Sequence, residues 1–162
     1  MLSLSADDIR FFKREGYLVK RGVLDPALME RAREAMWEAA PPELDRDDPD
    51  TWIGPLPKRS DEHRNYISGY YWKYRQIGAE DWMVRLLATD PSVWCAAERL
   101  LGKGTLQQPE RVRGIYCNLP EGGAPDSPRT CHIDGHPFHL GVVGYIDPVS
   151  YTHLTLPTKR IV

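Results

Sequence analysis

The chain has 162 residues, of which 41% are hydrophobic and 27% charged, and its formal net charge is −2. This length is enough for one domain with a hydrophobic core, and the near balance of charges excludes the strongly basic surface of a nucleic-acid-binding protein. The sequence contains no apolar run near the roughly 20 residues that a membrane-spanning helix needs, and its first residues lack the pattern of a signal peptide. Its three cysteines, Cys95, Cys117 and Cys131, have no metal-ligand spacing and indicate a reducing, cytoplasmic setting.

Four helix signals occur in the first part of the chain. Ser5 is a favourable N-cap with an acidic residue three positions further on, and Gly16 is a favourable helix stop. Asp25-Pro26 and Asp90-Pro91 each combine an N-cap with proline at the first helical position. The predicted helices cover residues 5–15, 26–40, 81–88 and 91–101.

Strand-like patterns are short at first and dominate the later part of the chain. Residues 17–19 and the aromatic run 70–74 favour strands. Three more strands are expected over residues 111–119, 130–135 and 138–147. Residues 41–65, rich in proline and aspartate, predict a long surface loop, or a lid anchored by Trp52 and Ile53. Helices first and strands later indicate an α+β domain with helices on one side of an antiparallel sheet.

His132 and Asp134 form a His-x-Asp pair within one of these later strands. Residues i and i+2 of a strand point to the same face, so an imidazole nitrogen and a carboxylate oxygen would reach one point together. They supply two thirds of the 2-His-1-carboxylate arrangement that holds Fe(II) and leaves positions open for substrate and O₂. The alternative is a histidine and an aspartate at a strand end, bonded to the backbone.

The other histidines near this pair are open to more than one interpretation. His136 shares its face if the strand continues, as a third ligand or as a hydrogen-bond partner of a ligand. Its neighbours, a glycine and a proline, favour a bend, so we expect a supporting or structural role. His139 is expected to bond to the backbone, and His63 to be solvated in the polar loop.

Four stretches resemble the phytanoyl-CoA dioxygenase family of Fe(II)/2-oxoglutarate oxygenases, over nearly all of residues 4–147. They are Leu4–Val19, similar to the family's N-terminal helix and strand, Arg113–Pro120, similar to the strand before the metal strand, His132-Ile133-Asp134, which matches the iron motif, and His136–Asp147, similar to the strand after it. The resemblance implies an α+β fold built on a double-stranded β-helix, the cupin-like jelly roll, with N-terminal helices flanking one sheet.

The resemblance also implies a function, the hydroxylation of a small-molecule C–H bond with O₂ while 2-oxoglutarate is decarboxylated to succinate. It implies that His132 and Asp134 bind Fe(II). Asp134 favours hydroxylation, because halogenating relatives have a small residue in place of this carboxylate. No nucleic-acid or membrane partner is expected.

Two further site residues follow from the resemblance alone. Lys73 lies on the strand where some members place a lysine near the co-substrate, and Ile115 lies where an apolar residue can flank that co-substrate. A surface cation and a plain core residue are the respective alternatives. In the family, the second iron histidine and the arginine that pairs with the far carboxylate of 2-oxoglutarate lie further downstream, and this sequence has neither.

Residues 149–158, with the sequence Val-Ser-Tyr-Thr-His-Leu-Thr-Leu-Pro-Thr, resemble a translated sequencing-library transposon adapter. We therefore expect residues 1–147 to be the N-terminal part of one phytanoyl-CoA dioxygenase-like domain, truncated within the β-core, and residues 148–162 to be a non-native tail. His153 is then no ligand, and the chain as written is an inactive chimera of an active parent. The alternatives are a genuine strand over residues 151–156 and a non-catalytic jelly-roll binding module.

Overall fold

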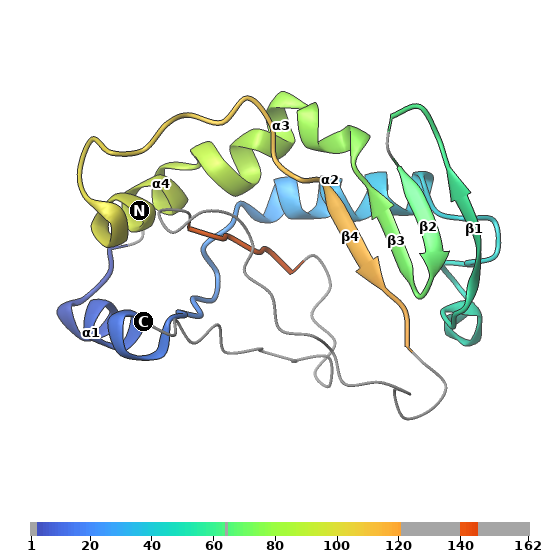
Figure 1. Cartoon of the computed structure of the whole chain (residues 1–162), viewed down its shortest axis with the longest axis horizontal. Helices are drawn as coiled ribbons and strands as arrows, with labels where there is room; N and C mark the ends of the chain where they lie inside the picture. The colour runs from blue at the N-terminus through green and yellow to red at the C-terminus, as the bar shows by residue number, and fades with distance from the viewer. Residues whose placement is uncertain (1–2, 64, 121–139, 146–162) are drawn as a thin grey trace.

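The computed structural model describes residues 3–63, 65–120 and 140–145, and Figure 1 shows how their elements are arranged. The α-helices are α1 (Ala6–Glu15), α2 (Pro26–Glu38), α3 (Asp81–Val84) and α4 (Pro91–Leu101), and the shorter helical turns are η1 (Pro49–Thr51), η2 (Gln76–Ala79) and η3 (Arg85–Thr89). The strands are β1 (Leu56–Ser60), β2 (Tyr66–Gly69), β3 (Tyr71–Tyr74) and β4 (Ile115–Asn118). Within the described part of the chain, no helix is both long enough and apolar enough to cross a membrane.

The predicted signals at both ends of α1 are confirmed. Ser5 Oγ accepts a hydrogen bond from the Asp8 backbone N–H (3.1 Å), and Asp8 Oδ2 accepts one from the Ser5 N–H (2.9 Å). This capping box satisfies two donors that the helix leaves unpaired. Gly16 then ends the helix with φ at 81°, which glycine adopts without a steric penalty. Asp25 and Asp90 cap α2 and α4 as predicted, each followed by proline.

The helix predicted over residues 81–88 consists of two parts. α3 continues directly into η3, a π-type turn closed by a hydrogen bond of 2.8 Å from the Asp90 N–H to the Arg85 carbonyl. Met83 and Leu86 lie on either side of this junction and are the largest fully buried side chains among the described residues. The junction therefore anchors this helical segment in the core.

The sheet includes two strands, β1 and β2, that the sequence patterns did not predict. β1 lies inside the predicted loop of residues 41–65, and its sequence Leu-Pro-Lys-Arg-Ser contains a proline that a central strand would not tolerate. The strand order β1-β2-β3-β4 puts β1 at an edge, where it pairs with β2 alone. Conversely, no strand forms at residues 17–19 or at residues 140–145, the described part of the strand predicted over residues 138–147.

All paired strands of the sheet are antiparallel. The prediction of mixed helix and strand with an antiparallel sheet is therefore confirmed. Figure 1 shows α2 running across the back of β2, β3 and β4.

The register of β3 with β4 decides which side chains share a face. Trp72 lies opposite Cys117, and Lys73 lies opposite Tyr116. Directly paired residues point to the same side of a sheet, and the next pair points to the other side. Trp72 and Cys117 therefore share one face, and Lys73 and Tyr116 share the opposite face.

The first of these faces is covered by α2 and forms the core. Ile115 is buried in one cluster with Ala32 of α2. Trp72 is buried in a second cluster with Leu44, and Trp37 of α2 packs against it. Because α2 contributes to both clusters, it connects the sheet with the helical segment around η3. We call the opposite face, which carries Lys73, the open face, because Tyr71 and Tyr116 on it are 42% and 38% exposed.

Gly114 offers a test of how closely β4 approaches β3. Its φ is +99°, and a Cβ there would lie 2.2 Å from the Tyr74 carbonyl oxygen. Gly104 also has a positive φ, +75°, but a Cβ there would meet no atom within 4 Å. We expect Gly104→Ala to lower the free energy of unfolding by about 1 kcal/mol and Gly114→Ala to lower it by roughly 2–5 kcal/mol, because the backbone must also shift. Equal losses in denaturant titrations would contradict this account.

Cys117 should be protected from alkylation. Burial raises the pKa of its thiol from 9.0 to about 12, and only the thiolate reacts. In a variant with Cys95→Ser and Cys131→Ser, we expect iodoacetamide to react with the folded chain at least about 100-fold more slowly than with the chain unfolded in guanidinium. Because the folded state keeps the proton, this burial stabilises the fold below pH 9.0, and the contribution is lost as the pH rises toward about 12. Equal rates would show that Cys117 is open to solvent.

Candidate functional site

The His-x-Asp pair, His132 and Asp134, lies outside the described residues, and so do His136 and His139. Within the ranges that the structure does describe, no group of three or more histidine, cysteine or acidic side chains could hold a metal ion. The geometry of the predicted iron site is thus untested. The described part of the candidate site is the open face of the sheet, where Lys73 lies.

Three tyrosine rings surround the ammonium group of Lys73. Its Nζ is 4.9 Å from the ring centroid of Tyr66 on β2, 5.0 Å from that of Tyr116 on β4 and 6.0 Å from that of Tyr71 on β3. A cation within about 6 Å of an aromatic centroid is attracted by the electrons of the ring face. The three strands therefore hold Lys73 half-buried in an aromatic surround, unlike a lysine that extends freely into water.

Arg75 shares two of these rings. Its guanidinium carbon is 5.4 Å from the centroid of Tyr66 and 5.9 Å from that of Tyr116. The Nε of Arg75 is buried and has no hydrogen-bond partner among the described residues. A buried donor without an acceptor costs about 1–3 kcal/mol. The open face thus concentrates two cations over the same pair of tyrosines.

The backbone of Arg75 is fixed by the turn between β1 and β2. Asn65 Oδ1 accepts hydrogen bonds from the N–H groups of Arg75 (2.7 Å) and Gln76 (2.9 Å). The Asn65 amide donates in turn to Asp61 Oδ2 (2.8 Å), and on the other side Arg111 Nη2 donates to the Arg75 carbonyl (3.2 Å). These contacts fix the position of the Arg75 backbone, from which the guanidinium group extends toward the tyrosine rings.

The charge of Asp61 is part of this arrangement. Burial acts to raise the pKa of its carboxyl group, but the hydrogen bonds donated by Asn65 and by the His63 backbone prevail and lower it. Asp61 therefore remains ionised and keeps Asn65 oriented toward the end of β3. His63 is exposed in this turn, as the sequence predicted.

Ile115 does not lie beside Lys73. It pairs with Tyr74, one position along from the Lys73–Tyr116 pair, and so it points to the face covered by α2. Its side chain is 5% exposed and belongs to the core. The structure thus separates the two residues expected near the co-substrate, and it favours the core alternative for Ile115. Tyr74 is on the same face, where burial, with added effects of Glu80 and Glu38, raises its pKa.

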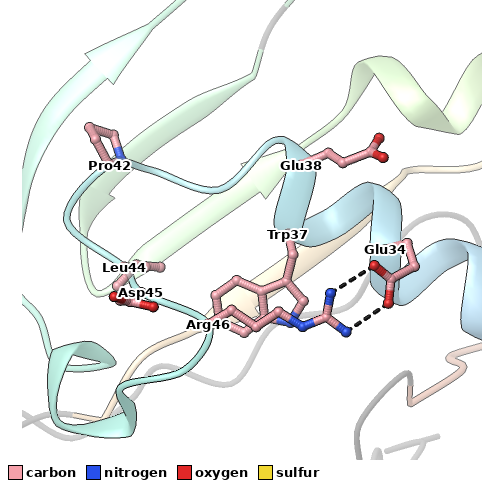
Figure 2. A pocket seen from close by; sticks show the side chains of 7 residues that line it. All are labelled: Glu34, Trp37, Glu38, Pro42, Leu44, Asp45 and Arg46. Carbon is pink, nitrogen blue, oxygen red and sulfur yellow. Dashed lines mark hydrogen bonds and ion pairs between the residues drawn. The ribbon is translucent and has the colours of Figure 1, made fainter.

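A second candidate is a surface hollow of about 450 Å³ between α2 and the loop that follows it (Figure 2). Arg46 in this loop donates to both carboxylate oxygens of Glu34 on α2, each at 2.7 Å. The hydrogen bonds from Arg46 lower the pKa of Glu34. Trp52 packs on Trp37 with ring centroids 5.2 Å apart. These contacts fasten the loop to α2. Trp52 therefore anchors the loop as expected, whereas Ile53, the other expected anchor, is 53% exposed.

A third candidate is a hollow of about 640 Å³ between α1 and the segment after it, lined in part by Phe11, Tyr17 and Val19. Tyr17 packs edge-on against Phe11 at 5.4 Å, and Val19 is 58% exposed. The charged side chains that line this hollow are already paired, as Arg10–Asp7, Arg14–Glu15 and Lys20–Asp8. The open face therefore remains the described region with the strongest ligand-binding character.

The resemblance named Lys73, whose role stays a prediction, but the sequence analysis named none of its neighbours on this face, Arg75, Tyr66 and Tyr116. One signal was present, because Lys73 and Arg75 are two residues apart and a strand places such residues on one face. The roles of the tyrosines depend on strand pairing between β2, β3 and β4, which local sequence patterns do not encode.

Comparisons with known proteins found no relative of this chain. No family model, no curated protein and no solved structure matches this chain.

Proposed function

We propose that this chain is the N-terminal part of a non-haem Fe(II)/2-oxoglutarate-dependent dioxygenase that hydroxylates a small molecule in the cytoplasm. The observation that carries the proposal is the division of the sheet into a face packed by α2 and an open face bearing Lys73 among tyrosines. In a jelly roll, helices flank one sheet and ligands bind on the inner side, facing the second sheet. The antiparallel sheet β1–β4 is compatible with such an arrangement, and the His-x-Asp motif follows it in the chain.

In this proposal His132 and Asp134 hold the iron. A neutral imidazole and an anionic carboxylate are the ligand types that Fe(II) takes in this class of site. The bound iron would activate O₂ and, with 2-oxoglutarate, supply the oxidising power for hydroxylation. The part of Lys73 is electrostatic, since a half-buried ammonium group can bind a carboxylate of the co-substrate and orient it. Ile115, the first residue of β4, would contribute only to the packing of the core against α2.

A non-catalytic binding module is the second candidate. The observation that favours it is that Lys73 and its tyrosines form a binding surface without any contribution from a metal. The two candidates differ in the residues that the uninterrupted gene encodes after Asp147. An oxygenase requires a further histidine and, about ten residues later, an arginine, and a binding module requires neither.

The iron ligands can be tested in the protein encoded by the uninterrupted gene. We expect Fe(II)-dependent formation of succinate from 2-oxoglutarate, abolished by His132→Ala and by Asp134→Ala because each removes a ligand. His63→Ala is the matched control, since His63 is exposed in a turn and should leave turnover unchanged. The chain of 162 residues alone should consume no 2-oxoglutarate. Turnover that persists in His132→Ala would refute the assignment of the motif.

Lys73 can be tested in the same protein. We expect Lys73→Gln to raise the KM for 2-oxoglutarate about 10- to 100-fold, because a charge-assisted hydrogen bond contributes about 1.5–3 kcal/mol. Lys58→Gln on the edge strand β1 is the control, because Lys58 is exposed. An unchanged KM in Lys73→Gln would leave Lys73 as a surface cation.

A further inference from the structure

The partners of Arg75 are aromatic rings, whereas five other arginines of the described structure have acidic partners. Five arginines pair with a carboxylate close to them, and these pairs are Arg10–Asp7, Arg14–Glu15, Arg33–Glu30, Arg46–Glu34 and Arg59–Glu43. Neither Arg75 nor Lys73 forms an ion pair with any acidic group in the described ranges. The contacts of these two cations are the rings of Tyr66 and Tyr116, which they share, and the ring of Tyr71, which only Lys73 reaches.

Two like charges over one pair of rings repel each other. The tyrosine rings lower this cost, because each ring face attracts a cation, but they cannot neutralise the charge. An anion between the two cations would neutralise it and would also supply the acceptor that the Arg75 Nε–H lacks. This part of the open face therefore carries two cations without an anionic partner and one buried N–H without an acceptor among the described residues.

The site is also held in position before any ligand arrives. Asn65 and Arg111 fix the Arg75 backbone on both sides, and the pairing of β3 with β2 and β4 sets the places of Tyr66 and Tyr116 around Lys73. A guanidinium group held in this way loses little freedom when it binds, and its planar fork matches the oxygens of a carboxylate or a phosphate.

We propose that Arg75 and Lys73 together form an anion-binding site on the open face, which takes the carboxylate or phosphate group of a small organic anion. Arg75 is the residue that selects for this group. The site needs no metal, so it extends beyond the oxygenase proposal.

The test uses the 162-residue chain with a metal chelator, so that iron plays no part. Succinate and inorganic phosphate are titrated separately while the ¹⁵N resonance of the Arg75 Nε–H is followed, with Arg75→Lys used to assign it. We expect a saturable shift that weakens as the salt concentration rises, since salt screens charge pairs. The tighter of the two probes identifies the group that the site prefers. No saturable shift with either probe would overturn the proposal.

Substitutions then distinguish the specific contribution of Arg75 to anion binding from the effect of net charge alone. Arg75→Gln and Lys73→Gln should each weaken binding at least about 10-fold, because each removes a charge-assisted hydrogen bond. Arg59→Gln is the matched control. Arg59 lies on the same sheet, but it is paired with Glu43 and in register with Ile67 on the face covered by α2. An equal loss of anion affinity in Arg59→Gln would show that the effect depends only on net charge, and it would refute the site.

The outcome is independent of the oxygenase assay. Anion binding that depends on Arg75, together with no iron-dependent turnover in the protein from the uninterrupted gene, would support the site and reject the dioxygenase. Turnover that depends on His132, with no shift at Arg75, would support the dioxygenase and reject the site.

Discussion

The packing of helix α2 against one face of the four-stranded sheet is the constraint on which the described structure depends. Trp72 and Ile115 point toward α2 and are buried with its side chains. Because side chains alternate along a strand, burying these residues sends Lys73 and Tyr116 to the opposite side. The chemistry of the open face is therefore a consequence of the core, and a shift of one residue in the register would exchange the two faces.

The same helix supports the segments around the sheet. The loop that follows α2 is fastened back onto it by the contact of Trp52 with Trp37 and by the ion pair of Arg46 with Glu34. The loop then enters β1, the edge strand. Its aspartates and prolines, which suggest an unstructured lid when taken alone, build tight turns that end in this anchor, with Trp52 Nε1 donating to the Asp45 carbonyl at 2.6 Å.

The open face brings together positive charge and aromatic surface. Lys73 and Arg75 lie over shared tyrosine rings, and neither is paired with an acidic group among the described residues. A protein with a net charge of −2 has carboxylates available for such pairing, and five of its described arginines use them. The anion-binding site proposed for this face rests on this separation of the two cations from the acidic side chains, and it does not depend on a metal site.

The sequence by itself determined both ends of α1 and α4 and the start of α2, because a helix cap is set by residues within one turn of each other, as in the pairing of Ser5 with Asp8. It also determined the general class, mixed helix and strand with an antiparallel sheet, and it named Lys73 and the His-x-Asp pair, whose roles stay predictions. Only the tertiary structure decided that β1 is a strand, that Ile115 belongs to the core and that Arg75 joins Lys73. These features depend on pairing between segments distant in the chain, and the energy of such pairing comes from partners that no local pattern specifies.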